Sequence, residues 1–106
     1  MDSIDVHELK RRLDAGESFR LVDVREEDEW AFCRLPRAEW LPLSRFAAEA
    51  SQTLRAEEPI ILYCHHGVRS LHAGQFLEQL GFTRITNLSG GVHAWSKQVD
   101  ASVPTY

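Results

Sequence analysis

The stretch Pro59-Ile60-Ile61-Leu62-Tyr63-Cys64-His65-His66-Gly67-Val68-Arg69-Ser70 decides the fold. The apolar, partly β-branched run after the proline predicts a short strand buried on both faces, as in parallel sheets flanked by helices. Over residues 71–80 the apolar positions recur at i, i+3, i+4 and i+7, which predicts a helix. The order is therefore strand, tight loop and helix, and Cys64 lies where the strand ends.

The loop between this strand and helix is suited to hold an anion. Backbone N–H groups and the positive end of the helix dipole converge at the carboxyl edge of such a sheet. Gly67 permits a left-handed backbone, and Arg69 carries a permanent positive charge. A thiol at Cys64 is then expected to ionise readily. The alternative is that Cys64 is a small core residue, the usual role of a cysteine that ends an apolar strand.

Three stretches of the sequence resemble the rhodanese-like sulfurtransferases. Residues 64–70 resemble the active-site loop of that family: Cys, two variable residues, Gly, a variable residue, and often Arg followed by Ser or Thr. Residues 21–26, with the acidic and aromatic run to Trp30, resemble its first sheet strand and following helix turn, and residues 88–95 its closing motif of paired glycines and a tryptophan. The resemblance implies an α/β fold with a central, mainly parallel sheet of about five strands and helices on both faces. Alternating strands and helices predict the same class.

The resemblance also implies a reaction. Cys64 would attack the outer sulfur of a donor such as thiosulfate, release sulfite and hold a persulfide, which then passes to cyanide, a thiol or a sulfur-carrier protein. Arg69 would hold the sulfonate end of the donor or orient the loop, while Ser70 would cap the helix or donate to sulfur, the cap being favoured. The expected substrate-binding residues are His65, His66, Gly67, Val68, Arg69 and Ser70.

Two other functions compete on the same loop. A phosphatase or arsenate-reductase-like enzyme would also use a cysteine thiolate, but tyrosine phosphatases place their arginine six positions after the cysteine. Here Arg69 follows Cys64 by five positions, which favours the tighter sulfurtransferase loop. The other candidate is a non-catalytic rhodanese-like binding module, and such modules commonly lose the cysteine that this chain retains.

Length and composition narrow the class of protein. With 106 residues the chain suits one domain, and we expect a single rhodanese-like domain over residues 1–106. The formal net charge of −4 argues against a nucleic-acid surface. No apolar run approaches the ~20 residues that a membrane helix requires, so no membrane partner is expected. The start of the chain is acidic and poor in apolar residues, unlike a signal peptide, which predicts a cytoplasmic location.

The cysteines and histidines raise two further questions. We expect both cysteines to be free thiols, because a reducing compartment disfavours a bridge. Cys33 is then either a second thiol that resolves a persulfide or, as favoured, a packed small residue. Cys33, Arg34 and Arg37 stand where the family usually has Gly, His and Gly, so the local turn is in question.

Neither Cys-x-x-Cys nor His-Glu-x-x-His occurs in the sequence. No metal and no cofactor is therefore predicted from the possible zinc ligands His65, His66, His72, His93, Cys33 and Cys64.

The other expected elements follow from caps and periodicity. Asp5 and Glu8 form a capping box for a first helix that ends at Gly16. Asp23 and Arg25 stand at the end of the strand expected at 19–24, where they could line the site, but an ion pair, either mutual or with a helix, is favoured. The remaining expected elements are strands at 19–24 and 83–88, an extended stretch at 40–43, helices at 26–32, 44–54 (capped by Ser44) and 92–97, and an extended surface tail at 99–106.

Overall fold

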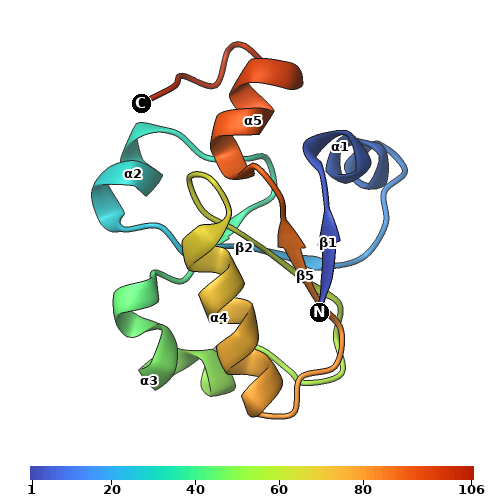
Figure 1. Ribbon diagram of the computed structural model, residues 1–106, viewed down its shortest axis with the longest axis vertical. Helices are drawn as coiled ribbons and strands as arrows, with labels where there is room; N and C mark the ends of the chain where they lie inside the picture. The colour runs from blue at the N-terminus through green and yellow to red at the C-terminus, as the bar shows by residue number, and fades with distance from the viewer.

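The computed structural model describes residues 1–106, in which five strands alternate with five helices (Figure 1). The strands are β1 (Asp2–Ile4), β2 (Arg20–Asp23), β3 (Glu39–Trp40), β4 (Ile60–Tyr63) and β5 (Ile85–Leu88). The helices are α1 (Val6–Asp14), α2 (Glu27–Phe32), α3 (Leu43–Thr53), α4 (Val68–Gln79) and α5 (Gly91–Gln98). All strand pairs are parallel, in the order β1-β5-β4-β2-β3. The expected α/β class and five-stranded parallel sheet are confirmed, and β4 is the central strand.

Each face of the sheet is covered by its own helices. Helices α3 and α4 pack together on one face, and α1 packs with α5 on the other (Figure 1). Successive side chains of β4 enter opposite layers: Ile60 and Leu62 join the first apolar cluster, whereas Ile61 and Tyr63 join the second. Because a strand alternates its side chains, a strand buried on both faces is typically apolar at successive positions. The pattern at residues 60–63 therefore reports a central position.

The carboxyl ends of the strands meet at one edge of the sheet. Tyr63 at the end of β4 pairs in register with Asp23 at the end of β2, and Asn87 of β5 pairs with Leu62. Helix α5 begins against the same edge, and its Val92 N–H donates to the Cys64 carbonyl at 3.0 Å. The loop after β4 is thus enclosed by the ends of β2 and β5 and by the start of α5.

Two expected helix starts are wrong. Helix α3 begins at Leu43 with Pro42 as its N-cap, and the hydroxyl of Ser44 donates instead to Glu26 at 2.7 Å. Helix α4 begins at Val68, three residues earlier than its apolar periodicity indicates, so Ser70 lies in the first turn rather than at the cap. Apolar periodicity identifies only the buried apolar face of a helix. It therefore misses the first turn of α4, where Arg69 and Ser70 form hydrogen bonds with other elements.

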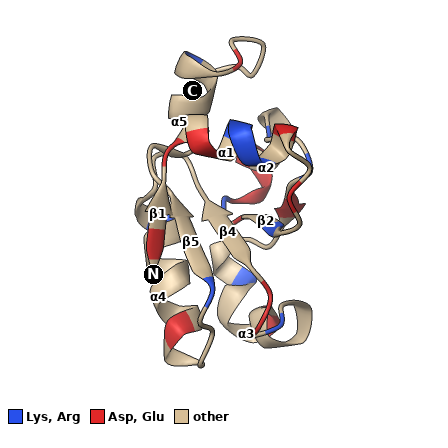
Figure 2. Ribbon diagram, turned by 90° about the vertical axis from the view of Figure 1, so that its right-hand side faces the viewer, with Lys and Arg blue, Asp and Glu red and all other residues tan.

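Surface chemistry is mixed. Acidic and basic positions are interspersed along the ribbon in Figure 2, in keeping with a formal net charge of −4. None of the five helices combines the length and the apolar character that a membrane crossing requires.

Candidate active site

The sulfur of Cys64 is surrounded by hydrogen-bond donors of its own loop. The Gly67 N–H lies 3.1 Å from Sγ, and the Ser70 N–H and the Ser70 hydroxyl each lie 3.4 Å from it. Gly67 has a φ of 113°, and a Cβ there would come within 3.3 Å of the Leu88 carbonyl. This left-handed, crowded position requires glycine. The residue Cys64 is only 1% exposed, so the sulfur is a buried acceptor among amides.

These donors act on the acidity of the thiol. Burial by itself raises the pKa of Cys64, but hydrogen bonds from the Ser70 hydroxyl and from the N–H groups of Ser70, Gly67 and His66 outweigh it, and the pKa lies below its ordinary value. The amides are fixed by the turn, so they cost no reorganisation when charge appears on sulfur. The arrangement therefore favours the thiolate.

Asn87 of β5 forms two side-chain hydrogen bonds with the cysteine loop and the first turn of α4. Its side-chain amide donates to the Gly67 carbonyl at 3.1 Å, and its Oδ1 accepts from the Ser70 hydroxyl at 2.6 Å. The single proton of that hydroxyl serves either Asn87 or Cys64 at one time, so the amides are the constant donors to sulfur. Sequence reasoning did not single out Asn87. Its signal was a polar amide within the buried run Ile85–Leu88, since a buried polar group requires partners.

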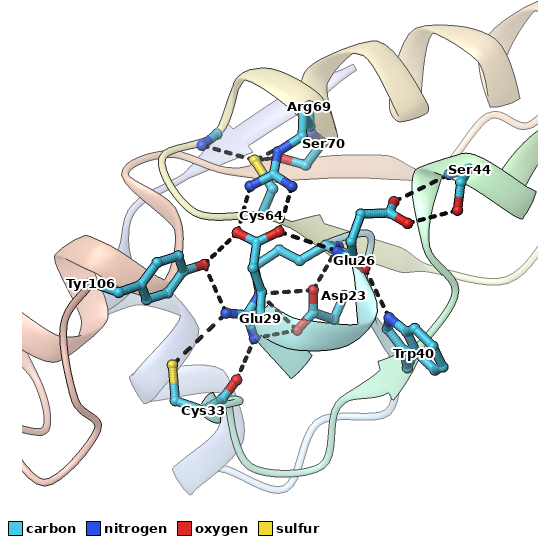
Figure 3. A network of polar contacts seen from close by, with 12 residues as sticks. Asp23, Glu26, Glu29, Cys33, Trp40, Ser44, Cys64, Arg69, Ser70 and Tyr106 are labelled. Carbon is cyan, nitrogen blue, oxygen red and sulfur yellow. Dashed lines mark hydrogen bonds and ion pairs between the residues drawn. The ribbon is translucent and has the colours of Figure 1, made fainter. Parts of the chain in front are cut away.

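Arg69 is engaged away from the sulfur. Its guanidinium forms two hydrogen bonds, of 2.7 and 2.8 Å, with the carboxylate of Glu29 in α2 (Figure 3). Tyr106 donates its hydroxyl to the same carboxylate at 2.7 Å. Chiefly because of the hydrogen bonds from Arg69, the pKa of Glu29 is lowered to about 2. The tail beyond α5, whose role the sequence left open, thus returns to α2 beside the loop (Figure 1).

A second polar cluster follows β2, next to the cysteine loop. Arg25 and Asp23 are both fully buried and form the expected ion pair, with Nη2 and Oδ2 2.7 Å apart. The guanidinium also donates to the Cys33 carbonyl and to the Tyr106 hydroxyl. Cys33 is a free, buried thiol that packs in the layer of α1 and α5. Its sulfur lies 3.8 Å from Arg25 Nη1, and its packing agrees with the favoured interpretation as a packed small residue.

The chain matches proteins of one family along nearly its full length. The family model described as Rhodanese-like domain matches residues 5–98. The chain belongs to the rhodanese-like domain family. It is 34% identical over 97 residues to a sulfurtransferase of Allochromatium vinosum, covering 92% of this chain and 90% of that protein. A crystal structure of a rhodanese-like domain protein from Staphylococcus aureus superposes with a TM-score of 0.84 at 30% identity, covering 100% of this chain and 99% of that one.

Other relatives are much longer than this rhodanese-like chain. The probable adenylyltransferase/sulfurtransferase MoeZ of Mycobacterium tuberculosis is 33% identical over 105 residues, which are 98% of this chain but 27% of that protein. The chain thus spans about a quarter of the length of this relative. The expected family is confirmed, and it includes proteins named as sulfurtransferases.

The remaining side chains of the rhodanese-like loop lie on its outer side. Val68 is 63% exposed. The His65 ring stacks on Tyr106 with centroids 3.9 Å apart. The centroid of the His66 ring lies 4.0 Å from that of His65 and 4.8 Å from that of His93. Burial, and then the charge of His66, lower the pKa of His65. Backbone N–H groups of this loop thus face the sulfur, and its two imidazoles gather with that of His93.

Proposed function

We propose that this rhodanese-like domain is a sulfurtransferase that carries a sulfane sulfur as a persulfide on Cys64. One observation carries the proposal: N–H groups at 3.1 and 3.4 Å, together with a hydroxyl, converge on a sulfur whose pKa they lower. The same dipoles would stabilise the thiolate before transfer and the persulfide anion after it. The relatives named as sulfurtransferases support this assignment.

The proposed cycle is a double displacement. The Cys64 thiolate attacks the outer sulfur of thiosulfate, an S–S bond forms to Sγ, and the bond to the sulfonate sulfur breaks as its electron pair leaves with sulfite. A thiolate or cyanide then attacks the outer sulfur of the persulfide, and the electron pair of the S–S bond returns to Cys64. No net proton or electron is consumed. Because the residue is 1% exposed, the side chains over Sγ move aside when donor and acceptor approach.

The residues of the loop take different roles in this proposal. Gly67 and Ser70 bind the anionic sulfur, while the backbone N–H of His66 adds a third amide. Arg69 positions the loop against α2 through Glu29, rather than holding the donor directly in the resting state. Val68 and the rings of His65 and His66 form the outer surface, where a donor or a carrier protein would arrive.

A phosphatase on this loop is less well supported. Oxyanion-binding arginines must present their donors to the phosphate oxygens. The Arg69 guanidinium instead makes a bidentate pair with Glu29 at 2.7 and 2.8 Å. An arsenate-reductase-like reaction would need the same free cation. A non-catalytic module would leave unexplained why three donors surround a cysteine.

We further propose that the acceptor is a thiol or a sulfur-carrier protein and that the reaction takes place in the cytoplasm. Both cysteines are free thiols, and a reducing compartment provides the thiol acceptors that discharge a persulfide.

The test is the intact mass of the protein after incubation with thiosulfate. Wild-type protein is expected to gain the mass of one sulfur, and cyanide is expected to remove it. Cys64→Ser should show no gain. Cys33→Ser is the matched control, because this second free cysteine is also buried, and it should load and discharge like the wild type.

Three outcomes would overturn the proposal. Sulfur retained in Cys64→Ser but lost in Cys33→Ser would place the persulfide on the other cysteine. Hydrolysis of an aryl phosphate without any sulfur gain would indicate the phosphatase. Binding of a specific protein that is unchanged in Cys64→Ser, with neither reaction observed, would indicate the binding module.

A further inference from the structure

Two consecutive histidines of the cysteine loop meet a third histidine, distant in sequence, at the start of α5. His65 and His66 follow β4, and His93 lies in the first turn of α5, which the backbone holds against the loop. The His93 N–H donates to the His65 carbonyl at 3.0 Å. One ligand nitrogen from each ring lies within 4.8 Å of the others. Sequence spacing could not show this cluster, because a tertiary contact brings the third member in.

We propose that His65, His66 and His93 form a binding site for a first-row divalent transition-metal ion, with Zn²⁺ as the reference ion. Imidazole nitrogen is a preferred ligand of Zn²⁺, Cu²⁺ and Ni²⁺. Three histidines with an open fourth position are a known zinc arrangement. The site does not use the proposed persulfide sulfur, since neither thiol belongs to the cluster.

Two ring nitrogens support a ligand at this place. His65 Nε2 and His93 Nδ1 are both buried and have no hydrogen-bond partner. A buried polar atom without a partner destabilises the fold, so such atoms are uncommon in folded proteins. Two of them in one three-residue cluster are accounted for if an ion completes the site. Both have lone pairs to give as long as each ring carries its proton on the other nitrogen.

The geometry permits closure onto an ion. Zn–N bonds of about 2.0–2.1 Å in a tetrahedral site put ligand nitrogens roughly 3.3 Å apart. The three nitrogens begin within 4.8 Å of one another, and His66 is exposed, so its side chain is free to rotate inward. His65 is already oriented by its stack on Tyr106, with an interplanar angle of 9°. The nitrogens must therefore approach one another by at most about 1.5 Å, and the exposed side chain of His66 is free to supply part of this movement.

The electrostatic surroundings accept a cation. Arg69 is the permanent cation of the same loop, and its charge is neutralised by the bidentate pair with Glu29. The exposed side of the cluster, at His66, leaves room for water or a small anion on the open position of the ion. A bound ion would tie the two residues after Cys64 to the first turn of α5.

The experiment is a Zn²⁺ titration of the chelator-treated protein by calorimetry, combined with X-ray absorption at the zinc edge. We expect one ion per chain and a ligand shell of nitrogen or oxygen near 2.0–2.1 Å, without sulfur near 2.3 Å. His66→Ala and His93→Gln are each expected to weaken Zn²⁺ affinity at least about tenfold. His72→Ala is the matched control, an exposed histidine on α4 outside the cluster, and should bind like the wild type.

The proposal fails if wild-type protein binds no Zn²⁺ or if His66→Ala binds as tightly as the wild type. It also fails if affinity is lost in Cys64→Ser or Cys33→Ser, or if sulfur appears in the ligand shell, because the ion would then be held by a thiolate. Because His66 is exposed, its variant is expected to fold, and circular dichroism checks this. None of these readouts depends on sulfur transfer, so the result stands whether or not Cys64 forms a persulfide.

Discussion

Two adjacent strands end at the same edge of the sheet, yet they stabilise charge in opposite ways (Figure 3). After β2, the buried carboxylate of Asp23 faces the buried guanidinium of Arg25 at 2.7 Å. After β4, the sulfur of Cys64 faces N–H and O–H dipoles, the closest being Gly67 N–H at 3.1 Å. The first charge is neutralised by a counter-ion, whereas the second would be held chiefly by dipoles.

This difference separates stability from reactivity. An ion pair buried within the protein cannot give up one partner without leaving the other charge unsolvated. An anion held by backbone dipoles keeps its electron pair available to an incoming electrophile. We therefore expect the Asp23–Arg25 pair to act on folding and the Cys64 loop to act on chemistry. Tyr106 links the two, since its hydroxyl contacts both Arg25 and Glu29.

Asp23→Asn tests most directly whether the buried Asp23–Arg25 pair stabilises the fold. The substitution leaves the guanidinium of Arg25, which is 0% exposed, without its counter-ion, and we expect it to lower the free energy of unfolding by about 3–5 kcal/mol. Urea unfolding measures this loss. Asp14→Asn removes an exposed pair with Lys10, whose side chains are 60% and 50% exposed, and is expected to cost less than about 1 kcal/mol. Equal losses in both variants would contradict the structural role of the buried pair.

Glu29 tests the link between the two clusters. Its pKa is lowered to about 2 from the model-compound value of 4.5, so the stability that its charge contributes is present above pH 4.5 and is lost as the pH falls toward 2. We expect Glu29→Gln to lower the free energy of unfolding by about 1–2 kcal/mol at pH 7, a discounted figure because Arg69 is partly exposed. Measured again at pH 3, the difference from wild type should shrink.

Glu27→Gln is the control for this measurement, because Glu27 is an exposed acid of the same helix. It should change stability little at either pH. A difference for Glu29→Gln that stays constant between pH 7 and pH 3 would show that the carboxylate charge is not the source of the stabilisation.

Ser70→Ala tests how the dipoles around Cys64 stabilise its thiolate. Loss of the hydroxyl at 3.4 Å from Sγ should raise the pKa of Cys64, and we expect alkylation by iodoacetamide at neutral pH to slow about three- to tenfold. The effect is bounded because the hydroxyl is shared with Asn87 and the amides remain. Ser96→Ala is the matched control, since this buried serine donates to the Val92 carbonyl. An alkylation rate unchanged by Ser70→Ala would leave the amides as the sole source of acidity.

The smallest expected effect concerns the turn before β3, which contains Arg37. Gly67 has the glycine that its left-handed backbone requires, but Arg37 has a φ of 65° with a side chain. We expect Arg37→Gly to raise the free energy of unfolding by about 0.5–1 kcal/mol, because relief of the strain exceeds the loss of exposed contacts to Glu17 and Phe19. Ala38→Gly, at a residue without positive φ, should destabilise. Destabilisation by both variants would show that the turn is not strained.

Local features were readable in the sequence. The capping bond from Glu8 N–H to Asp5 is present at 2.9 Å, and Gly81 follows α4 in a left-handed conformation. Neither requires knowledge of anything beyond a few neighbouring residues. The departure from the family pattern at Arg37 was also visible in the sequence. The structure shows that Arg37 adopts a left-handed backbone conformation.

The errors arose where a serine had two possible hydrogen-bond partners, one local and one tertiary. Ser44 and Ser70 both precede apolar helical patterns, so each was interpreted as a cap. In the fold, Glu26 and Asn87 compete for their hydroxyls, and each helix begins earlier. A cap is chosen by the free energy of the whole arrangement, because tertiary partners of a serine outweigh its local preference.

The sequence by itself determined the class of fold and the loop that holds Cys64, because apolar periodicity, glycine at a left-handed turn and the order of strand and helix depend on short-range sterics and burial. Only the tertiary structure decided which polar groups face one another: Arg69 with Glu29, and His93 with the two histidines after Cys64. These contacts join residues far apart in the chain, and their distances depend on how the layers pack across the sheet, which no local pattern records.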